Sequence, residues 1–385
     1  MKIGIDARCF ARGKITGVEE YTKNMLESIF DSDHTNSYIL FFNAWKNQDV
    51  DFAWATQYAN VSVKKFAIPN KLLNFCLWFF RYPKLDRLLG GVDVFFMPNN
   101  NFCAVSPNVD LLLTVHDLSF EHYKKTFSLK RQVWHFFVNP RLLMNRANHI
   151  FAVSEATKID LCTTYHIASQ KVTVMLNGKP SHMGTLSRND LSLITVKEKY
   201  KLPYKFILYF GTIEPRKNIV SIIKAFDILR KKNPQIPHKL VIAGSRGWRS
   251  VAIYTEKELA KYHADIMIIA DIPEEDKEAL YTLASVFVYP SFFEGFGFPP
   301  LEAMMCGTPV ITSHTSSLPE VGGSQCIMID PHRQEELVIA LEALLDDHVA
   351  VQSFFDSQKI VRYINKFNWR SSGDMFYQYV SSLNK

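Results

Sequence analysis

The chain of 385 residues lacks long uncharged apolar runs, cysteine pairs and a strong excess of charge. Because no such apolar run reaches about 18 residues, no transmembrane helix is expected. The six cysteines are scattered with no C-x-x-C pair, which is typical of reduced thiols in a cytoplasmic protein. The net charge of +6 is too weak to indicate a nucleic-acid partner, although it would suit an anionic ligand or an anionic membrane surface.

Other common signals are missing as well. The first residues lack the basic and apolar regions of a secretory signal, and Ile3–Asp6 instead predicts a short buried strand. The following loop, residues 7–17, contains Gly13 and Gly17 but no G-x-G-x-x-G spacing, which disfavours nicotinamide-dinucleotide binding. No internal repeat is visible. The apolar share of 47% is typical of globular proteins, and the length favours two domains.

Apolar stretches that predict strands alternate with stretches of helical periodicity. Strands are predicted at residues 3–6, 38–42, 61–66, 92–96, 110–115, 149–153, 171–175, 205–210, 239–244, 265–269, 286–289, 310–311 and 325–329. Helices are predicted at residues 18–30, 155–165, 219–231, 274–284, 334–345 and 367–383. This rhythm indicates an α/β fold with mainly parallel sheets. A polar stretch at 180–190 predicts domains at 1–180 and 195–365, with the terminal helix in 366–385 packing back toward the N-terminal domain.

The stretch 290–311 combines acids, glycines and a helix start. Glu294 precedes a turn with Gly295 and Gly297, and a proline pair then opens a helix that is predicted to carry Glu302 in its first turn. Glycines let a ligand approach main-chain N–H groups, and helix N-termini attract anions. The stretch therefore predicts a site for a ligand with hydroxyls and phosphates. The alternative is an ordinary loop and helix with surface acids.

Two further groups follow predicted strands. Arg216 and Lys217 stand at a predicted helix entrance, where positive charge is unfavourable, so an anion such as a diphosphate is expected between them. They could instead be two solvated surface cations. His116 and Asp117 lie at the C-terminal end of strand 110–115, where ligands bind in open α/β sheets. His116 could otherwise be a capping or core histidine.

Segments 70–89 and 120–146 are rich in aromatic and basic residues. A basic helix with an aromatic face can lie on an anionic membrane. The interpretation favoured for the individual side chains is that the aromatics belong to the core and the charges form a solvated face.

The motifs together resemble a known family. Glu294 and Glu302, with seven residues between them, are similar to the E-x7-E signature of retaining glycosyltransferases. Gly211–Asn218, Val115–Asp117, Val153–Glu155 and Asn177-Gly178 occur in the matching order, so that nearly the whole chain resembles glycosyltransferase family four. Bacterial enzymes that build O-antigen, capsule or exopolysaccharide resemble it most, and many are mannosyltransferases. The resemblance implies the GT-B fold, in which two Rossmann-like parallel-sheet domains face each other across a cleft, the N-terminal one on the acceptor side and the C-terminal one binding the donor.

The resemblance also implies roles for single residues. Glu294 would hold hydroxyls of the donor sugar, and Glu302 the ribose hydroxyls of the nucleotide. Arg216 and Lys217 would neutralise the diphosphate leaving group in place of a metal, so neither a metal nor a cofactor is expected. His116 would lie near the anomeric carbon. The donor sugar and phosphates would also be lined by main chain, at Gly295, Phe296, Gly297 and Phe298, while the loop of Gly13 and Gly17 would face the donor phosphates and the acceptor.

Two positions depart from the family pattern. Thr212 stands where many members have arginine, which would leave Arg216 to supply that charge beside Lys217. Glu19 and Glu20 stand where relatives often have glycine and arginine, and this difference would bear on the choice of acceptor.

The resemblance implies a cytoplasmic hexosyltransferase that can be peripheral on the inner face of the cytoplasmic membrane. Its expected partners are a nucleotide-sugar donor, best guessed as GDP-mannose, and a saccharide or lipid-linked saccharide acceptor in O-antigen or another surface polysaccharide, with no nucleic acid. UDP-glucose and dTDP-rhamnose are alternative donors. A glycoside hydrolase and a non-catalytic nucleotide-sugar-binding protein are the alternatives of another class.

Overall fold

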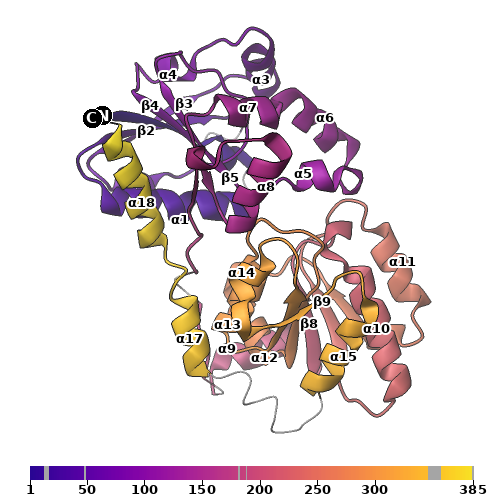
Figure 1. Cartoon of the computed structure of the whole chain (residues 1–385). Helices are drawn as coiled ribbons and strands as arrows, with labels where there is room; N and C mark the ends of the chain where they lie inside the picture. Colours follow the sequence, from indigo (N-terminus) through magenta and orange to yellow (C-terminus); the bar gives the residue numbers. More distant parts are fainter. Residues whose placement is uncertain (13–16, 47–48, 181–182, 188, 346–356, 384–385) are drawn as a thin grey trace. The chain divides into compact units, whose positions relative to one another are not determined.

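The chain forms two compact units, each built around its own parallel sheet (Figure 1). The computed structural model describes residues 1–385 except 13–16, 47–48, 181–182, 188, 346–356 and 384–385. The first unit consists of Met1–Leu118, Leu129–Gly178 and Phe367–Lys385. The second consists of Ser119–Ser128 and Lys179–Lys366. Both units are therefore discontinuous in sequence.

The first unit has a seven-stranded sheet in the order β3-β2-β1-β4-β5-β6-β7, with every pair parallel. Its strands are β1 Lys2–Asp6, β2 Ser37–Asn43, β3 Val61–Phe66, β4 Val94–Met97, β5 Asp110–Val115, β6 His149–Ala152 and β7 Val172–Val174. Its helices are α1 Gly17–Ser32, α2 Ala53–Thr56, α3 Asn70–Phe79, α4 Leu85–Leu88, α6 Leu129–Val138, α7 Pro140–Arg146, α8 Glu155–Tyr165 and α18 Trp369–Ser382, with 3₁₀ helices η1 Arg8–Arg12 and η3 Ser169–Lys171.

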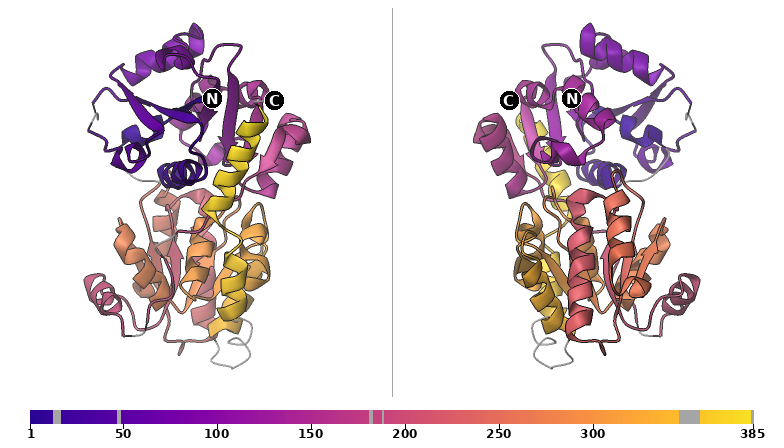
Figure 2. Two further views of the ribbon diagram at one scale, coloured as in Figure 1. Left: turned by 90° about the vertical axis from the view of Figure 1, so that its left-hand side faces the viewer. Right: turned by 90° about the vertical axis from the view of Figure 1, so that its right-hand side faces the viewer.

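Helices on both faces of this sheet explain its continuous apolar strands. All four residues of β4 are buried, as a parallel strand covered on both sides requires. Helix α1 buries an apolar stripe that includes Tyr21, Met25 and Ile29. Helix α18, yellow in the figures, packs along α1 (Figures 1 and 2). The last helix of the chain thus belongs to the core of the first unit.

The second unit has a six-stranded parallel sheet in the order β10-β9-β8-β11-β12-β13. Its strands are β8 Phe206–Phe210, β9 Lys239–Ala243, β10 Ile266–Ile269, β11 Val286–Tyr289, β12 Val310–Ser313 and β13 Ile327–Ile329. Its helices are α5 Ser119–His122, α9 Leu191–Lys199, α10 Ile219–Lys232, α11 Val251–Leu259, α12 Glu274–Leu283, α13 Phe298–Met305, α14 Leu318–Gly322, α15 Gln334–Leu345 and α17 Ser357–Ile364, with 3₁₀ helices η2 Lys124–Thr126, η4 Pro215–Lys217, η5 His263–Asp265 and η6 Gly323–Gln325.

The strand order of the second sheet reverses between β8 and β11. From β8 the chain builds outward through β9 and β10, and it then returns to place β11 on the other side of β8. The loops that leave the carboxyl ends of β8 and β11 therefore diverge at a topological switch point, the place where open α/β sheets bind ligands.

The structure corrects several predicted elements. Helix α13 begins at Phe298, with Gly297 as its cap, so Glu302 lies beyond the first turn rather than in it. The predicted loop 7–17 contains η1, and its Gly13 lies outside the described residues. Helices α9, α11 and α17 were not predicted, although Asp190 caps the start of α9 by accepting from the N–H of Ser192.

Candidate functional site

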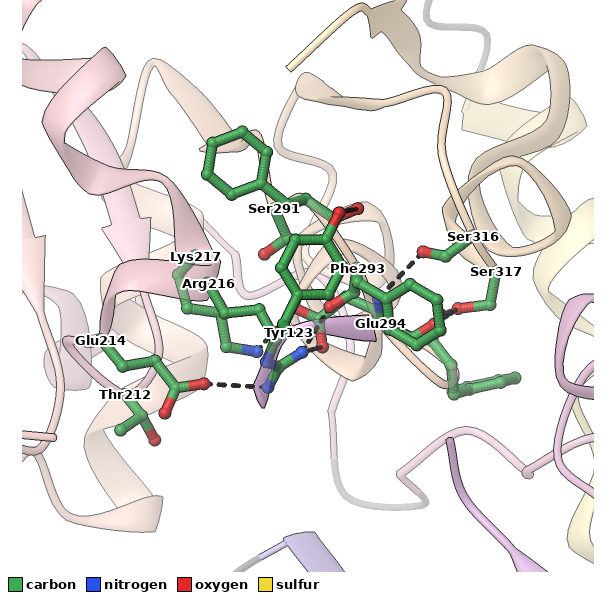
Figure 3. A network of polar contacts seen from close by, with 12 residues as sticks. Tyr123, Thr212, Glu214, Arg216, Lys217, Ser291, Phe293, Glu294, Ser316 and Ser317 are labelled. Atoms are coloured by element: carbon green, nitrogen blue, oxygen red, sulfur yellow. Dashed lines mark hydrogen bonds and ion pairs between the residues drawn. The ribbon is translucent and has the colours of Figure 1, made fainter. Parts of the chain in front are cut away.

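A network of buried charges lies at the switch point of the second sheet (Figure 3). Arg216 and Lys217 come from η4, after β8, and Glu294 comes from the loop between β11 and α13. Glu294 lies 78 positions after Arg216 and 77 after Lys217, and the parallel pairing of β8 with β11 brings the two loops together. The side chains of these three residues are at most 13% exposed.

The carboxylate of Glu294 lies between the two cations. Lys217 Nζ donates to Glu294 Oε1 at 2.6 Å, and Arg216 Nη1 donates to Glu294 Oε2 at 3.0 Å. Each oxygen of the carboxylate thus has its own cation. The anion that the sequence pattern indicated between Arg216 and Lys217 is, in this structure, a side chain of the same unit.

Both cations have further partners. Arg216 Nη2 donates to Glu214 Oε1 at 2.9 Å, and its Nη1 also donates to the carbonyl of Phe293. Lys217 Nζ donates to Tyr289 Oη at 2.7 Å and lies 5.1 Å from the centre of that ring. The carboxylates of Glu214 and Glu294 and the cations Arg216 and Lys217 thus form one network, whose two negative and two positive formal charges balance.

The network keeps Glu294 ionised. Burial by itself would raise the pKa of this carboxyl, but the charges of Arg216 and Lys217 outweigh burial and lower its pKa to about 2. Burial, followed by the charge of Arg216, lowers the pKa of Lys217, and Glu294 opposes that change. A fixed carboxylate beside two cations offers acceptors for hydroxyls and donors for phosphate oxygens.

Hydroxyls on the β12–α14 connection hold the main chain of the Glu294 loop. The N–H of Glu294 donates to Ser316 Oγ at 2.9 Å, while Ser317 Oγ lies 3.0 Å from the carbonyl of Glu294 and 2.7 Å from that of Phe296. Gly297 has φ of +113°, and a Cβ there would lie 2.8 Å from Leu318 Cδ2. The turn from Gly295 to Phe298 is therefore restrained by its neighbours and requires glycine at 297.

The segment after β5 contacts the same loop. Although it follows a strand of the first unit, Ser119–Ser128 belongs to the second. The Tyr123 ring stacks on Phe292, with centroids 6.3 Å apart. It also lies 5.8 Å from the ring of Phe293 (Figure 3). Arg216 also acts on this tyrosine, because its charge opposes the burial that raises the Tyr123 pKa. The sequence analysis did not connect this segment with the Glu294 loop.

Glu302 lies deeper in the same unit. Its side chain is buried, and Tyr281 Oη of α12 donates to Glu302 Oε2 at 2.8 Å. The burial of Tyr281, together with the charge of Glu302, raises the pKa of the phenol well above its ordinary value. Glu302 is thus an acceptor within the helix that the Glu294 loop leads into, and it is not a surface acid.

His116 and Gly17 belong to the first unit. His116 Nε2 lies 2.9 Å from the carbonyl of Pro98, at the end of β4, and the His116 ring meets the edge of Tyr21 at 4.6 Å. Desolvation lowers the pKa of His116. Gly17 is the exposed first residue of α1. An added Cβ there would meet nothing within 4 Å, so packing alone does not require glycine at this position.

Sequence analysis missed three contributors to the network. Glu214 is 1% exposed, and its acidic side chain two residues before Arg216 was an available signal. Tyr289 was assigned only to a strand, and Ser317 lies in a connection without a motif. The described residues contain no group of three or more histidine, cysteine or acidic side chains arranged to hold a metal ion. None of the described helices is long and apolar enough to cross a bilayer.

Two family models match the chain, one in each half. The model described as "Glycosyltransferase Family 4" matches residues 15–179, and the model described as "Glycosyl transferases group 1" matches residues 194–362.

Curated relatives share moderate identity over part of the chain. "O-antigen chain mannosyltransferase B" of Escherichia coli is 32% identical over 206 residues, which cover 53% of each chain. "O-antigen chain mannosyltransferase RfbU" of Salmonella typhimurium is 27% identical over 244 residues, which cover 62% of this chain and 63% of the relative. The first of these alignments spans about half of the relative's length, and neither reaches two thirds.

Solved structures share the fold over the whole chain. Anabaena Alr3699/HepE, solved in complex with UDP and glucose, superposes with a TM-score of 0.73 at 16% identity, covering 99% of this chain and 100% of that one. WaaG, described as a glycosyltransferase involved in lipopolysaccharide biosynthesis, gives 0.70 at 14% identity, covering 97% and 98%. At such identities the likeness concerns the fold alone.

Proposed function

This chain belongs to glycosyltransferase family 4 and has the GT-B fold, and we propose that it is a retaining hexosyltransferase. The proposed reaction moves mannose from GDP-mannose to a saccharide acceptor carried on a lipid. Its product is an O-antigen or another surface polysaccharide. The O-antigen mannosyltransferases among its relatives support this choice of sugar and pathway class.

The buried network of Arg216, Lys217 and Glu294 is the observation that carries the proposal. The two oxygens of Glu294 each accept from one cation, and a carboxylate oxygen has a second lone pair for a sugar hydroxyl. Arg216 and Lys217 supply charged N–H donors for the phosphates. Glu302, in the adjoining helix, would accept from the ribose, and the main chain of Gly295–Phe298 would line the sugar and phosphates between the two acids.

In the proposed step, the bond between the anomeric carbon and the diphosphate oxygen breaks, and its electron pair stays on that oxygen. Arg216 and Lys217 stabilise the negative charge that develops there. The acceptor hydroxyl oxygen forms the new bond on the same face of the sugar, and its proton passes to the departing phosphate oxygen. No metal takes part in the proposed step, because the two cations carry the electrostatic role. His116 is assigned to the donor sugar on the family resemblance.

The proposed location is the cytoplasm, at the inner face of the membrane. All six cysteines are free thiols, which supports a reducing compartment. The lipid-linked acceptor would be met at the membrane surface.

The experiment combines ligand binding with turnover. Since a ligand that binds the native state raises the unfolding temperature, we expect GDP to stabilise the protein more than UDP or dTDP. We expect GDP release from GDP-mannose in the presence of a polyprenyl-linked saccharide, with an α-linked product by NMR. The double variant R216A/K217A should lower kcat/KM by at least about 10³-fold, because it removes both donors to the leaving group.

Other outcomes identify the alternatives. Preferential stabilisation by UDP or dTDP, with turnover of UDP-glucose or dTDP-rhamnose, would retain the fold and mechanism but change the donor. Release of sugar from polysaccharide without any nucleotide would indicate a hydrolase. Nucleotide binding without turnover of any donor would indicate a non-catalytic binding protein. An unchanged kcat/KM in R216A/K217A would refute the leaving-group role.

A further inference from the structure

Two helices of the first unit turn an apolar stripe toward solvent. On α3 Leu72, Phe75 and Phe79 are exposed at the i, i+3, i+7 spacing of one helix face, and Trp78 beside them is exposed as well, while Leu73 and Leu77 pack inward. On α6 the corresponding stripe is Leu129, Val133 and Phe136. Phe79 and Phe136 are 62% and 78% exposed. The favoured interpretation of these aromatics as core residues is therefore wrong for the most exposed ones.

Ring contacts join the two stripes into one surface, which we call the α3–α6 face. Phe75 stacks on Phe79 at 5.7 Å, and Trp78 of α3 meets Phe137 of α6 edge-on at 4.8 Å. Phe136 adjoins Phe137 at 5.4 Å. Figure 1 places both helices in the first unit. A contiguous apolar surface of this kind marks an interaction site, unlike single exposed apolar residues.

The two segments that contain α3 and α6 carry a strong charge of one sign. Residues 70–89 and 129–146 contain eight lysines and arginines and one acid, a net charge of +7, whereas the whole chain carries +6. All other residues together therefore carry about −1. The eight cations are Lys71, Arg81, Lys84, Arg87, Lys130, Arg131, Arg141 and Arg146.

The single acid does not offset this charge at the surface. Asp86 is 4% exposed, and one of its carboxylate oxygens accepts from the N–H of Ser106 at 2.8 Å. Seven of the eight cations are in contrast exposed, and only Lys84 is half-buried. These two segments thus present aromatic rings and positive charges, and no exposed carboxylate of their own.

We propose that the α3–α6 face is the surface by which this protein lies on an anionic phospholipid membrane. Apolar side chains on such a surface enter the boundary between headgroups and acyl chains, while lysine and arginine pair with lipid phosphates. A second copy of the chain fits the face less well, because a symmetric contact would oppose two patches of net positive charge. The face would bring the enzyme to its proposed lipid-linked acceptor.

The test measures binding to vesicles without any sugar nucleotide, so that its outcome does not depend on the proposed activity. The whole protein is sedimented with vesicles of phosphatidylcholine alone and of phosphatidylcholine mixed with phosphatidylglycerol. We expect binding to the mixed vesicles, weakening as salt rises, and little binding to phosphatidylcholine.

Two variants separate the apolar and the charged contributions. F79S/F136S should lower the partition coefficient by about tenfold or more, because two exposed rings no longer enter the interface. K130E/R131E should lower it by at least about tenfold, since each basic residue contributes about 1 kcal/mol near an anionic surface. All four positions are exposed, so both variants should have the same thermal unfolding temperature as the wild type.

Matched controls replace exposed residues of the second unit. L259S removes an apolar side chain that is 76% exposed on α11, and K359E/R362E reverses two exposed cations on α17. Neither should change binding. Absence of binding to anionic vesicles, equal binding to both vesicle types, or equal losses in the controls would each overturn the proposal. So would a stable oligomer that dissociates in F79S/F136S, since the α3–α6 face would then be a subunit contact.

Discussion

At the scale of the residue, the central feature is a carboxylate held between two cations. Glu294 is 8% exposed, and a buried charge is tolerated only when it is paired. Arg216 and Lys217 provide that pairing, and Glu214 gives Arg216 a second acid. The residues proposed to bind the donor therefore also stabilise one another, so that stability and function are joined at this site.

Replacing Glu294 tests this dependence. E294Q leaves two buried cations facing a neutral amide, and we expect it to lower the free energy of unfolding by about 3–5 kcal/mol and to abolish turnover. Urea unfolding measures the first effect. E342Q is the control, because the pair of Glu342 with Lys232 is largely exposed and should contribute less than about 1 kcal/mol.

The same variant has a predictable pH dependence. The folded state lowers the pKa of Glu294 from 4.5 to about 2, so its contribution to stability is complete above the ordinary pKa and is lost as pH falls through the folded one. The difference in stability between wild type and E294Q should therefore shrink as the pH is lowered from 4.5 toward 2. A difference that stays constant in acid would mean that the ion pairs do not stabilise the protein.

At the scale of the element, the order of strands decides which loops meet. Because β8 lies between β9 and β11, the loop at 211–218 reaches the loop at 290–297. The strand ends must also approach closely, and glycine permits this: an added Cβ at Gly244 would lie 2.1 Å from the carbonyl oxygen of Gly211. Gly244 further has φ of +136°, which disfavours any side chain.

Substituting Gly244 should therefore disturb the site from a distance. G244A must separate the ends of β8 and β9, and we expect it to cost about 1–3 kcal/mol and to weaken nucleotide binding by at least tenfold. The displaced segment carries Arg216 and Lys217. G184A is the control in the same unit, because the nearest atom to its new Cβ would be 3.9 Å away. Calorimetry and nucleotide titration measure the two effects, and intact nucleotide binding in G244A would contradict this coupling.

The sequence predicted most helices and strands but not the tertiary contacts between them. Helices α8 and α15 match their predicted ranges, because their periodicity and caps are local signals. The contact of Lys217 with Glu294 depends on strand order, which local patterns do not reveal. Composition likewise showed that segment 70–89 is rich in aromatic and basic residues without showing which of the rings a partner covers, and this is why the exposure of Phe79 was not foreseen.

At the scale of the whole molecule, neither unit is a continuous piece of chain. The first unit takes α18 from the far end of the sequence, and Ser32 Oγ of α1 donates to Asp374 at 2.7 Å. The Phe376 ring lies 4.8 Å from Phe96 and 5.7 Å from Phe151. At Gly373, an added Cβ would lie 2.4 Å from the carbonyl oxygen of Ser28, so the two helices touch at the backbone.

Truncating Phe376 should therefore weaken the first unit selectively. F376A removes a fully buried ring, and we expect a loss of about 3–5 kcal/mol in the stability of that unit. Hydrogen exchange should then quicken in α1 and β4 but not in β8 or β11. The control is M375A, because the side chain of Met375 on the same helix is 40% exposed; it should leave hydrogen exchange in both units unchanged. Equal acceleration in both sheets would show that the chain unfolds as one cooperative body.

The position of α18 has a consequence for how the protein is made. A ribosome releases the chain from its N-terminus, and domains generally fold as units as they emerge. The sequence of the second unit ends at Lys366, whereas the first unit needs residues beyond it. The first unit therefore cannot be completed until the second unit has been synthesised to its end. Until then, the surface of α1 that α18 covers in the finished protein stays exposed. The unit whose synthesis begins first is completed last, and we expect chaperones to bind the exposed surface of α1 in the meantime.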